Sequence, residues 1–157
     1  MRKARAKKRI LLPDPRFGET LVTRFVNTMM MSGKKNLAFK IFYDAMDIVE
    51  KNKSDEESAL DVWKKALSNV MPQVEVRSRR IGGATFQIPM EIRAERKQFY
   101  AMSWMIKFAR KRNEKSMAQK LASEILAAQK EEGAAVKKRT DTHKMAEANK
   151  AFSHFRF

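Results

Sequence analysis

The hydrophobic residues of this chain recur at helical spacing almost throughout, and they switch to alternation only between residues 74 and 92. Two alternating runs, residues 74–79 and 86–92, lie on either side of Gly82 and Gly83. Alternation on both sides of a Gly-Gly pair is a strong signal for a β-hairpin. The sequence therefore predicts a mainly α fold, a bundle of about six helices with one protruding β-hairpin at about residues 73–92.

Characteristic residues predict where the helices begin and end. Gly33 suits the position just after the first helix, whose apolar stripe runs from residue 21 to residue 30. Residues 54–57 form a capping box that predicts the start of the third helix, and Pro72 ends it. Asn113 ends the fourth helix and Gly133 the fifth. The last segment is helix-prone but weakly amphipathic, with its best apolar face at Met145, Ala148 and Phe152.

The large apolar side chains are predicted to fill the core. The fourth helix carries two apolar stripes, which predicts burial on two sides: Phe99, Met102, Ile106 and Ala109, and Tyr100, Trp104 and Phe108. Trp63 and Trp104 lie on such stripes, so neither is predicted to stack on bases. Helical spacing favours core filling over an adaptable binding groove for the eleven methionines. At the base of the hairpin we expect packing on helices by Val74, Val76, Ile88, Met90 and Ile92.

The charge of the chain is far from balanced. Thirty-four Lys and Arg against 18 Asp and Glu leave +16 among 157 residues, and a folded chain with that charge repels itself unless a polyanion neutralises it. Residues 44–61 reverse the sign, with seven acids against two lysines, so that segment is −5 and the rest +21. This polarity predicts one face for a polyanion and another turned away from it.

The basic residues fall into an N-terminal arm and four clusters. Residues 1–12 are predicted to be the arm, because a dense basic block without an acid does not fold alone, and residues 13–157 to be a single helical domain. Cations at loops and tips reach phosphates without being masked by a neighbouring helix. The arm carries Arg2, Lys3, Arg5, Lys7, Lys8 and Arg9; the clusters are Lys34 and Lys35; Arg77, Arg79 and Arg80; Arg110, Lys111, Arg112 and Lys115; and Lys137, Lys138 and Arg139.

Several other functions are excluded or disfavoured. The chain has no Cys and two His, which excludes thiolate zinc sites and leaves too few ligands for a histidine metal site. Asp141, His143 and Glu147 could meet on one helix face, but a solvated or RNA-facing surface is the favoured interpretation. No nucleotide-binding or hydrolase motif is present. We therefore expect no enzyme, no cofactor, no membrane partner and no homo-oligomer.

Nucleic acid is thus the predicted partner, but charge alone does not distinguish RNA from DNA. No helix-turn-helix spacing is evident, whereas a basic arm and hairpin on a small bundle suit irregular RNA, whose shape is read from several sides. Two alternatives remain: an architectural protein that compacts DNA, and an RNA-modifying enzyme. A competition between duplex DNA and structured RNA tests the first, and substitution of His143 tests the second.

Six stretches resemble the bacterial small-subunit ribosomal protein seven family. They occur in the expected order and cover residues 10–157: LPDP at 12–15, FVNTMMMSGKK at 25–35, PQVEVRSRRIGGATFQIP at 72–89, KSMA at 115–118, AVKKR at 135–139 and HKMAEANKAF at 143–152. The resemblance implies a cytoplasmic ribosomal protein that binds the 3′ major domain of 16S rRNA and nucleates assembly of the head of the small subunit.

The resemblance also implies a place and partners for the chain. It implies a position at the subunit interface near the decoding centre, beside the exit-site tRNA and in contact with small-subunit ribosomal proteins nine and eleven. The basic arm and the clusters at residues 34–35, 110–115 and 137–139 would face rRNA. The hairpin tip would face the tRNA, through Arg77, Arg79, Arg80, Gly82, Gly83 and Thr85.

Overall fold

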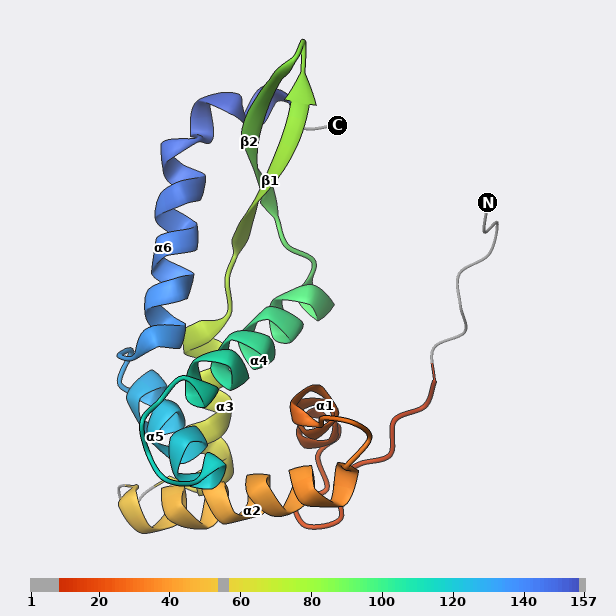
Figure 1. The fold of residues 1–157 in the computed structure, drawn as a ribbon, viewed down its shortest axis with the longest axis vertical. Helices are drawn as coiled ribbons and strands as arrows, with labels where there is room; N and C mark the ends of the chain where they lie inside the picture. Colours follow the sequence, from red (N-terminus) through yellow and green to blue (C-terminus); the bar gives the residue numbers. More distant parts are fainter. Residues whose placement is uncertain (1–8, 54–56, 156–157) are drawn as a thin grey trace.

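The computed structural model describes residues 9–53 and 57–155, and its architecture is mainly helical with one antiparallel hairpin (Figure 1). This confirms the predicted fold class. The elements in chain order are α1 (Thr20–Met29), α2 (Lys35–Asn52), α3 (Ala59–Val70), β1 (Val74–Ile81), β2 (Ala84–Glu91), α4 (Ala94–Arg110), α5 (Met117–Gln129), α6 (Ala134–Ala148) and the 3-10 helix η1 (Lys150–Phe155).

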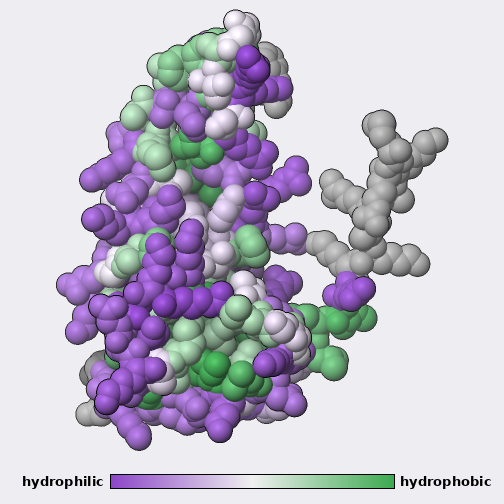
Figure 2. Space-filling model, in the orientation of Figure 1, coloured by the Kyte–Doolittle hydropathy of each residue, from purple (hydrophilic) through white to green (hydrophobic). Residues whose placement is uncertain are grey.

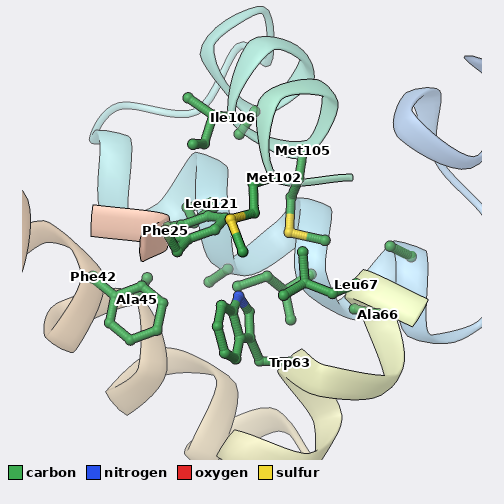
Figure 3. Close-up of a cluster of buried hydrophobic side chains, with 14 of the residues drawn as sticks. Phe25, Phe42, Ala45, Trp63, Ala66, Leu67, Met102, Met105, Ile106 and Leu121 are labelled. Atoms are coloured by element: carbon green, nitrogen blue, oxygen red, sulfur yellow. The ribbon is translucent and has the colours of Figure 1, made fainter. Parts of the chain in front are cut away.

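Helices α1–α5 form a helical body around a core of large side chains (Figure 3). Trp63 of α3 is fully buried, and its ring meets Phe25 of α1 at 5.5 Å and Phe42 of α2 at 5.4 Å between centroids. Met105 of α4 and Leu121 of α5 are also fully buried and complete this cluster. Aromatic pairs at these tilted and edge-on angles stabilise a core beyond the area that they bury. Trp63 is thus a core residue, as its stripe predicted.

Three predicted helix boundaries are wrong. Helix α5 ends at Gln129, and Gly133 is the N-cap of α6 instead of the end of α5. Helix α1 ends at Met29, and Gly33 lies in the loop before α2, where both Ser32 and Gly33 have positive φ. The predicted capping box at residues 54–57 does not start α3, because the N-cap is Ser58, whose hydroxyl accepts from the Asp61 backbone N–H; residues 54–56 themselves lie outside the described residues. The loops before α2 and α3 are longer than the sequence signals indicated.

The hairpin has a two-residue turn, and its register divides the apolar residues of its base, which are all buried or half-buried, between two faces. Gly82 and Gly83 both have positive φ, which is what a tight two-residue turn requires. Glu75 pairs with Met90, and Val76 pairs with Pro89, so Glu75 shares a face with Ile88 and Met90 while Val74 and Val76 lie on the other face. Glu75 is buried and the two valines are only half-buried. The predicted set of five apolar residues therefore does not form one face.

The hairpin extends away from the helical body, and α6 runs beside it (Figure 1). The short helix η1 closes the far end, where Phe86 of β2 packs on Phe152 at 5.1 Å and on Phe155 at 5.8 Å. We call β1, β2, α6 and η1 the hairpin unit. Helix α6 buries small residues, Ala135, Val136, Thr142 and Ala146, while Met145 is 46% exposed, so the predicted apolar face of the last segment is wrong.

Candidate nucleic-acid interface

Two predicted clusters meet although they lie about 75 residues apart in the sequence. Lys34 and Lys35 precede and begin α2, and Arg110 ends α4; the Arg110 guanidinium donates to the backbone carbonyl of Met29 at 2.9 Å. Lys34 and Arg110 line a hollow of about 310 Å³, together with apolar side chains at Met29, Met30, Met31, Leu37, Ala38, Ile41 and Met117. The structure therefore builds one surface from the two junctions, with exposed cations around an apolar floor.

Three other lysines of these two clusters are exposed. Lys35 is exposed and lies 5.7 Å from the centre of the Phe39 ring, and Lys111 lies 6.0 Å from the Phe108 ring. Lys115 is exposed in the loop between α4 and α5. Lys35 and Lys111 remain exposed to solvent on the side away from their rings, and Lys115 is exposed in its loop, so these three are placed to meet phosphates.

Arg112 has a different environment from the rest of its cluster. Its Nε lies 2.6 Å from the Glu124 carboxylate, which is almost completely buried, and its Nη1 lies 3.4 Å from Glu114. The other oxygen of Glu124 accepts from the backbone N–H of Ala135 at 3.0 Å, at the start of α6. Arg112 therefore ties the α4–α5 loop to α5 and α6.

Glu124 is a positioning residue that the sequence interpretation missed. A carboxylate is costly to bury unless it is paired, and Glu124 is paired on both oxygens. The available signal was its place on the same apolar stripe as Leu121, Ile125 and Ala128 of α5. A charge on an apolar stripe indicates a buried partner, and Arg112 is that partner.

The cluster on α6 also contains both an exposed cation and one that binds another part of the chain. Lys137 is exposed and Lys138 is half-buried beside the hairpin. Arg139 donates from its guanidinium to the backbone carbonyl of Asn69, near the end of α3, and so ties α6 to the helical body. The structure therefore separates the exposed Lys137 from a structural Arg139.

The hairpin cations also have two environments. Arg80, Gly82, Gly83 and Thr85 are exposed at the tip, whereas Arg79 donates to the Phe155 carbonyl of η1 at 3.3 Å. Near the body, Arg77 donates to Glu75 at 2.6 Å, and the hydroxyl of Tyr100 on α4 donates to the other oxygen of Glu75 at 2.6 Å. Arg77 is thus bound to the base of the hairpin, and the tip presents the more exposed part.

Glu75 is ionised in this network. Burial raises the pKa of its carboxyl, but the hydrogen bonds from Tyr100 and Arg77, with the charges of Arg77 and Arg96, outweigh burial and leave the pKa below its usual value. One carboxylate therefore holds β1 against α4 through two partners on that helix, Tyr100 and Arg96, while Arg77 binds it from β1 itself.

His143 supports the hairpin from α6. Its Nε2 accepts from the backbone N–H of Gln73 at 3.0 Å, just before β1. Burial and the charge of Arg139 lower the pKa of the imidazole, so the neutral acceptor form is favoured. Asp141 and Glu147 are exposed on the same helix, and the residues that the structure describes contain no cluster able to hold a metal ion.

The predicted arm contacts Arg2, Lys3, Arg5, Lys7 and Lys8 lie outside the described residues, and Arg9 is exposed. A turn at Asp14 fixes the point where this segment joins the body. One oxygen of the buried Asp14 accepts from the backbone N–H groups of Arg16 and Phe17, and the other accepts from the Tyr43 hydroxyl at 2.7 Å. Burial and that hydrogen bond raise the pKa of Tyr43 to about 12.

The acidic segment that the sequence indicated includes exposed residues of α2, the same helix that Lys35 begins, so these acids are distant from the hairpin but not from every basic cluster. Asp44, Asp47 and Glu50 are exposed along α2, at the end of the molecule opposite the hairpin (Figure 1). Hydrophilic side chains cover most of the face shown in Figure 2, with hydrophobic surface gathered mainly over the lower body. Among the helices of the described ranges, none is long and apolar enough to cross a bilayer.

Comparison with known proteins extends along the whole chain. A sequence profile for ribosomal protein S7p/S5e matches residues 1–150. The chain is similar to proteins named small ribosomal subunit protein uS7: it is 75% identical over 158 aligned residues to that of Flavobacterium psychrophilum. The identities are 74% for Christiangramia forsetii and 60% for Porphyromonas gingivalis strain W83. All three alignments cover 100% of both chains.

These matches confirm the resemblance that the six sequence stretches indicated, and they fit the prediction of a non-enzymatic protein, because the family is one of ribosomal proteins. On both the profile and the full-length relatives, the chain belongs to the ribosomal protein S7p/S5e family.

Proposed function

We propose that this chain is a structural constituent of the small ribosomal subunit that binds the 3′ major domain of 16S rRNA and nucleates assembly of the head. The observation that carries the proposal is the full-length similarity to proteins named small ribosomal subunit protein uS7, joined to the surface at Lys34 and Arg110. That surface offers exposed cations from two junctions to one RNA segment, which is how phosphate contacts fix the register of a nucleic acid.

The proposal includes a position and partners. The chain lies at the subunit interface near the decoding centre, with the hairpin tip beside the exit-site tRNA, and it contacts small-subunit ribosomal proteins nine and eleven. The exposed tip of the hairpin supports the tRNA assignment, because Arg80 and Thr85 form an exposed pair close to the turn. The exposed Arg9 and the charge of residues 2–9 support an rRNA contact by the basic arm.

Binding of a 3′ major domain transcript at several salt concentrations tests the proposal. About 6–10 phosphate contacts lower affinity by ~10³–10⁵ between about 50 and 200 mM salt. Lys34→Gln with Lys115→Gln should reduce the slope of log K against log salt by about two, because each removed phosphate contact removes about one. The matched control is Lys51→Gln with Lys130→Gln, which removes the same charge from positions away from the proposed surface.

The results separate the proposed function from its alternatives. A flat salt response of the wild-type chain contradicts RNA binding through phosphates. An equal reduction of the salt slope in both double variants shows that only net charge matters, which contradicts the assigned surface. Duplex DNA that competes as well as the transcript favours an architectural DNA-binding protein. Co-sedimentation of the tagged chain with small subunits in a lysate tests the ribosomal role directly.

A further inference from the structure

Helix α4 presents a row of aromatic rings on its surface, contrary to the prediction that both of its stripes are buried. Phe99 is 54% exposed, and Tyr100 and Trp104 are half-buried. The Phe99 and Tyr100 rings lie 6.2 Å apart, and the Tyr100 and Trp104 rings 5.5 Å apart. The exposed Phe99 ring thus continues into two half-buried rings, and a continuous apolar patch of this kind, unlike a single exposed residue, indicates a contact site.

The row lies between two hollows. On the α1 side, Arg24, Asn27, Thr28 and Gln98 surround a hollow of about 240 Å³ that Phe99 borders. On the hairpin side, Tyr100 and Trp104 border a hollow of about 460 Å³ that also contains Arg77, Arg96 and Lys138. Each hollow thus combines an aromatic wall with at least one cation.

The charges around the row favour a polyanion. The Arg96 guanidinium lies 5.1 Å from the centre of the Tyr100 ring, and the Arg24 guanidinium donates to Gln98 at 3.4 Å. Each hollow has one acid: Glu75, which is neutralised by Arg77 and Arg96, and the exposed Glu95. A protein partner would have to supply both apolar groups and acids, whereas single-stranded RNA carries ring faces and phosphates on every nucleotide.

We propose that this row is a stacking site for unpaired nucleotides of the bound RNA, with a base on the exposed Phe99 ring and the flanking phosphates at Arg24 and Arg96. The inference rests on the proposed RNA-binding function and adds the part of the RNA that this surface takes. The nucleotides are unpaired because an A-form duplex covers its base faces. Stacking tolerates any base, so this site adds affinity without reading sequence.

Four substitutions of Phe99 test the proposal in the full chain. Phe99→Ala and Phe99→Leu remove the ring, and Phe99→Leu keeps an apolar side chain; Phe99→Tyr and Phe99→Trp keep a ring. The probes are the 3′ major domain transcript and a short oligouridylate. We expect the Ala and Leu variants to bind about 5- to 150-fold more weakly, the affinity equivalent of one lost base stack, and the Tyr and Trp variants to bind like the wild type.

Three further measurements separate a lost base stack from a lost phosphate contact and from a destabilised fold, and test whether RNA reaches the row. The salt slope of the Ala and Leu variants should equal that of the wild type, because stacking releases no counterions, in contrast to Lys34→Gln. Thermal unfolding should be unchanged in all four, because Phe99 is more than half exposed. Fluorescence of Trp104 should be quenched by RNA, while Trp63 is fully buried and does not respond.

Each outcome has a distinct meaning. Wild-type affinity in Phe99→Ala overturns the stacking site and leaves the proposed RNA binding intact. Wild-type affinity in Phe99→Leu shows that an apolar contact suffices, as it would for a protein partner, and also overturns the site. If the wild-type chain itself binds neither probe, the proposed function fails, and the stacking site fails with it.

Discussion

The helical body and the hairpin unit are held together by different forces. Apart from Glu124, the largest fully buried side chains of the body are apolar, with Trp63, Phe25 and Phe42 at its centre. The hairpin unit buries Ile88 and the small α6 residues Ala135, Val136 and Ala146 together with a carboxylate, and it depends on the Glu75 network, on His143 and on Phe86 against η1. A two-stranded hairpin is only marginally stable by itself. The helical body is therefore stabilised mainly by apolar burial, whereas the hairpin unit, which extends away from the body, depends more on polar contacts.

This division has a consequence for stability. Apolar burial scales with area and is insensitive to pH, whereas a polar network is lost when one member changes charge. Regions with few buried apolar contacts open locally before the whole protein unfolds. We therefore expect substitutions in the body to act on the whole molecule, and changes of pH or of polar partners to act first on the hairpin unit.

The largest effect is expected for Trp63→Ala. Removing the ring at the centre of three helices should lower the free energy of unfolding by about 3–5 kcal/mol, measured by urea denaturation. Trp63→Phe is the matched control and should cost less, because it keeps a ring and removes an indole N–H that has no hydrogen-bond partner among the described residues. A cost below that of Trp63→Phe for the alanine variant would contradict the assignment of this ring as the centre of the core.

The next largest decrease in the free energy of unfolding is expected for Glu124→Gln. A hydrogen bond between charged groups contributes about 1.5–3 kcal/mol, and this variant weakens the one to Arg112 and leaves the guanidinium with less compensation. The pair with Arg112→Gln should be strongly non-additive in a double-mutant cycle followed by urea denaturation. Additive costs would show that the 2.6 Å contact does not couple these residues.

The same residues sharpen the assignment of the rRNA-facing cluster. Arg112→Gln should lower stability and leave the salt slope of RNA binding unchanged, whereas Lys115→Gln should lower that slope by about one and leave stability unchanged. The reverse result would mean that Arg112 leaves Glu124 to meet phosphate in the complex.

Acid should loosen the hairpin unit before the body, through two groups. The lowered pKa of His143 means that its contribution is complete above its usual pKa and is lost as pH falls from that value through the lower folded pKa. The lowered pKa of Glu75 gives a contribution that is lost as pH falls below the usual range for a carboxyl, through the folded pKa. Hydrogen exchange should therefore accelerate first at the amides of β1 and β2, and less so in α3.

A substitution checks the cause of this acid effect. His143→Gln keeps an acceptor for the Gln73 N–H and does not titrate, so it should remove the change in hairpin exchange that begins below the usual histidine pKa and leave the change in the carboxyl range. Simultaneous loss of protection in α3 and in the strands would contradict the separation of the two regions.

The sequence predicted the elements better than their packing. Local signals suffice for the turn at Gly82 and Gly83 and for the core stripe with Trp63, because periodicity and turn residues act over a few positions. The register of the hairpin depends on partners far along the chain: Glu75 is buried because Tyr100 and Arg77 reach it, and no local pattern announces that.

The candidate site could be predicted only in part for the same reason, because its contacts join residues far apart in the sequence. The basic clusters were visible in the sequence, but only the fold separates Lys34 and Lys115, which are exposed, from Arg112 and Arg139, which hold other parts of the chain. Phe99 was predicted to be buried because it lies on one helical stripe with Met102 and Ile106. Periodicity does not show how far the neighbouring elements extend along α4, and Phe99 is 54% exposed.

The smallest effect on stability is expected at the hairpin tip. The register shows that residues 80–85 can be replaced by Asn-Gly while Arg79 still pairs with Phe86, so that Phe86 keeps its contacts with Phe152 and Phe155. An Asn-Gly turn supplies the two positive φ angles that the two glycines supply now. Unfolding by urea should therefore change by no more than about 0.5 kcal/mol.

The functional effect of that tip variant should be large and confined to translation. Its affinity for the 3′ major domain transcript should match the wild type after allowance for the single lost cation at Arg80. Ribosomes that carry it should differ in retention of exit-site tRNA or in reading-frame maintenance, because the removed residues are those proposed to face the tRNA. The matched control is Arg80→Gln, which removes the same charge and keeps the length of the hairpin. A collapse of rRNA affinity with normal frameshifting in the surviving ribosomes would make the tip an rRNA anchor, since the strands and their packing on η1 are intact in this variant.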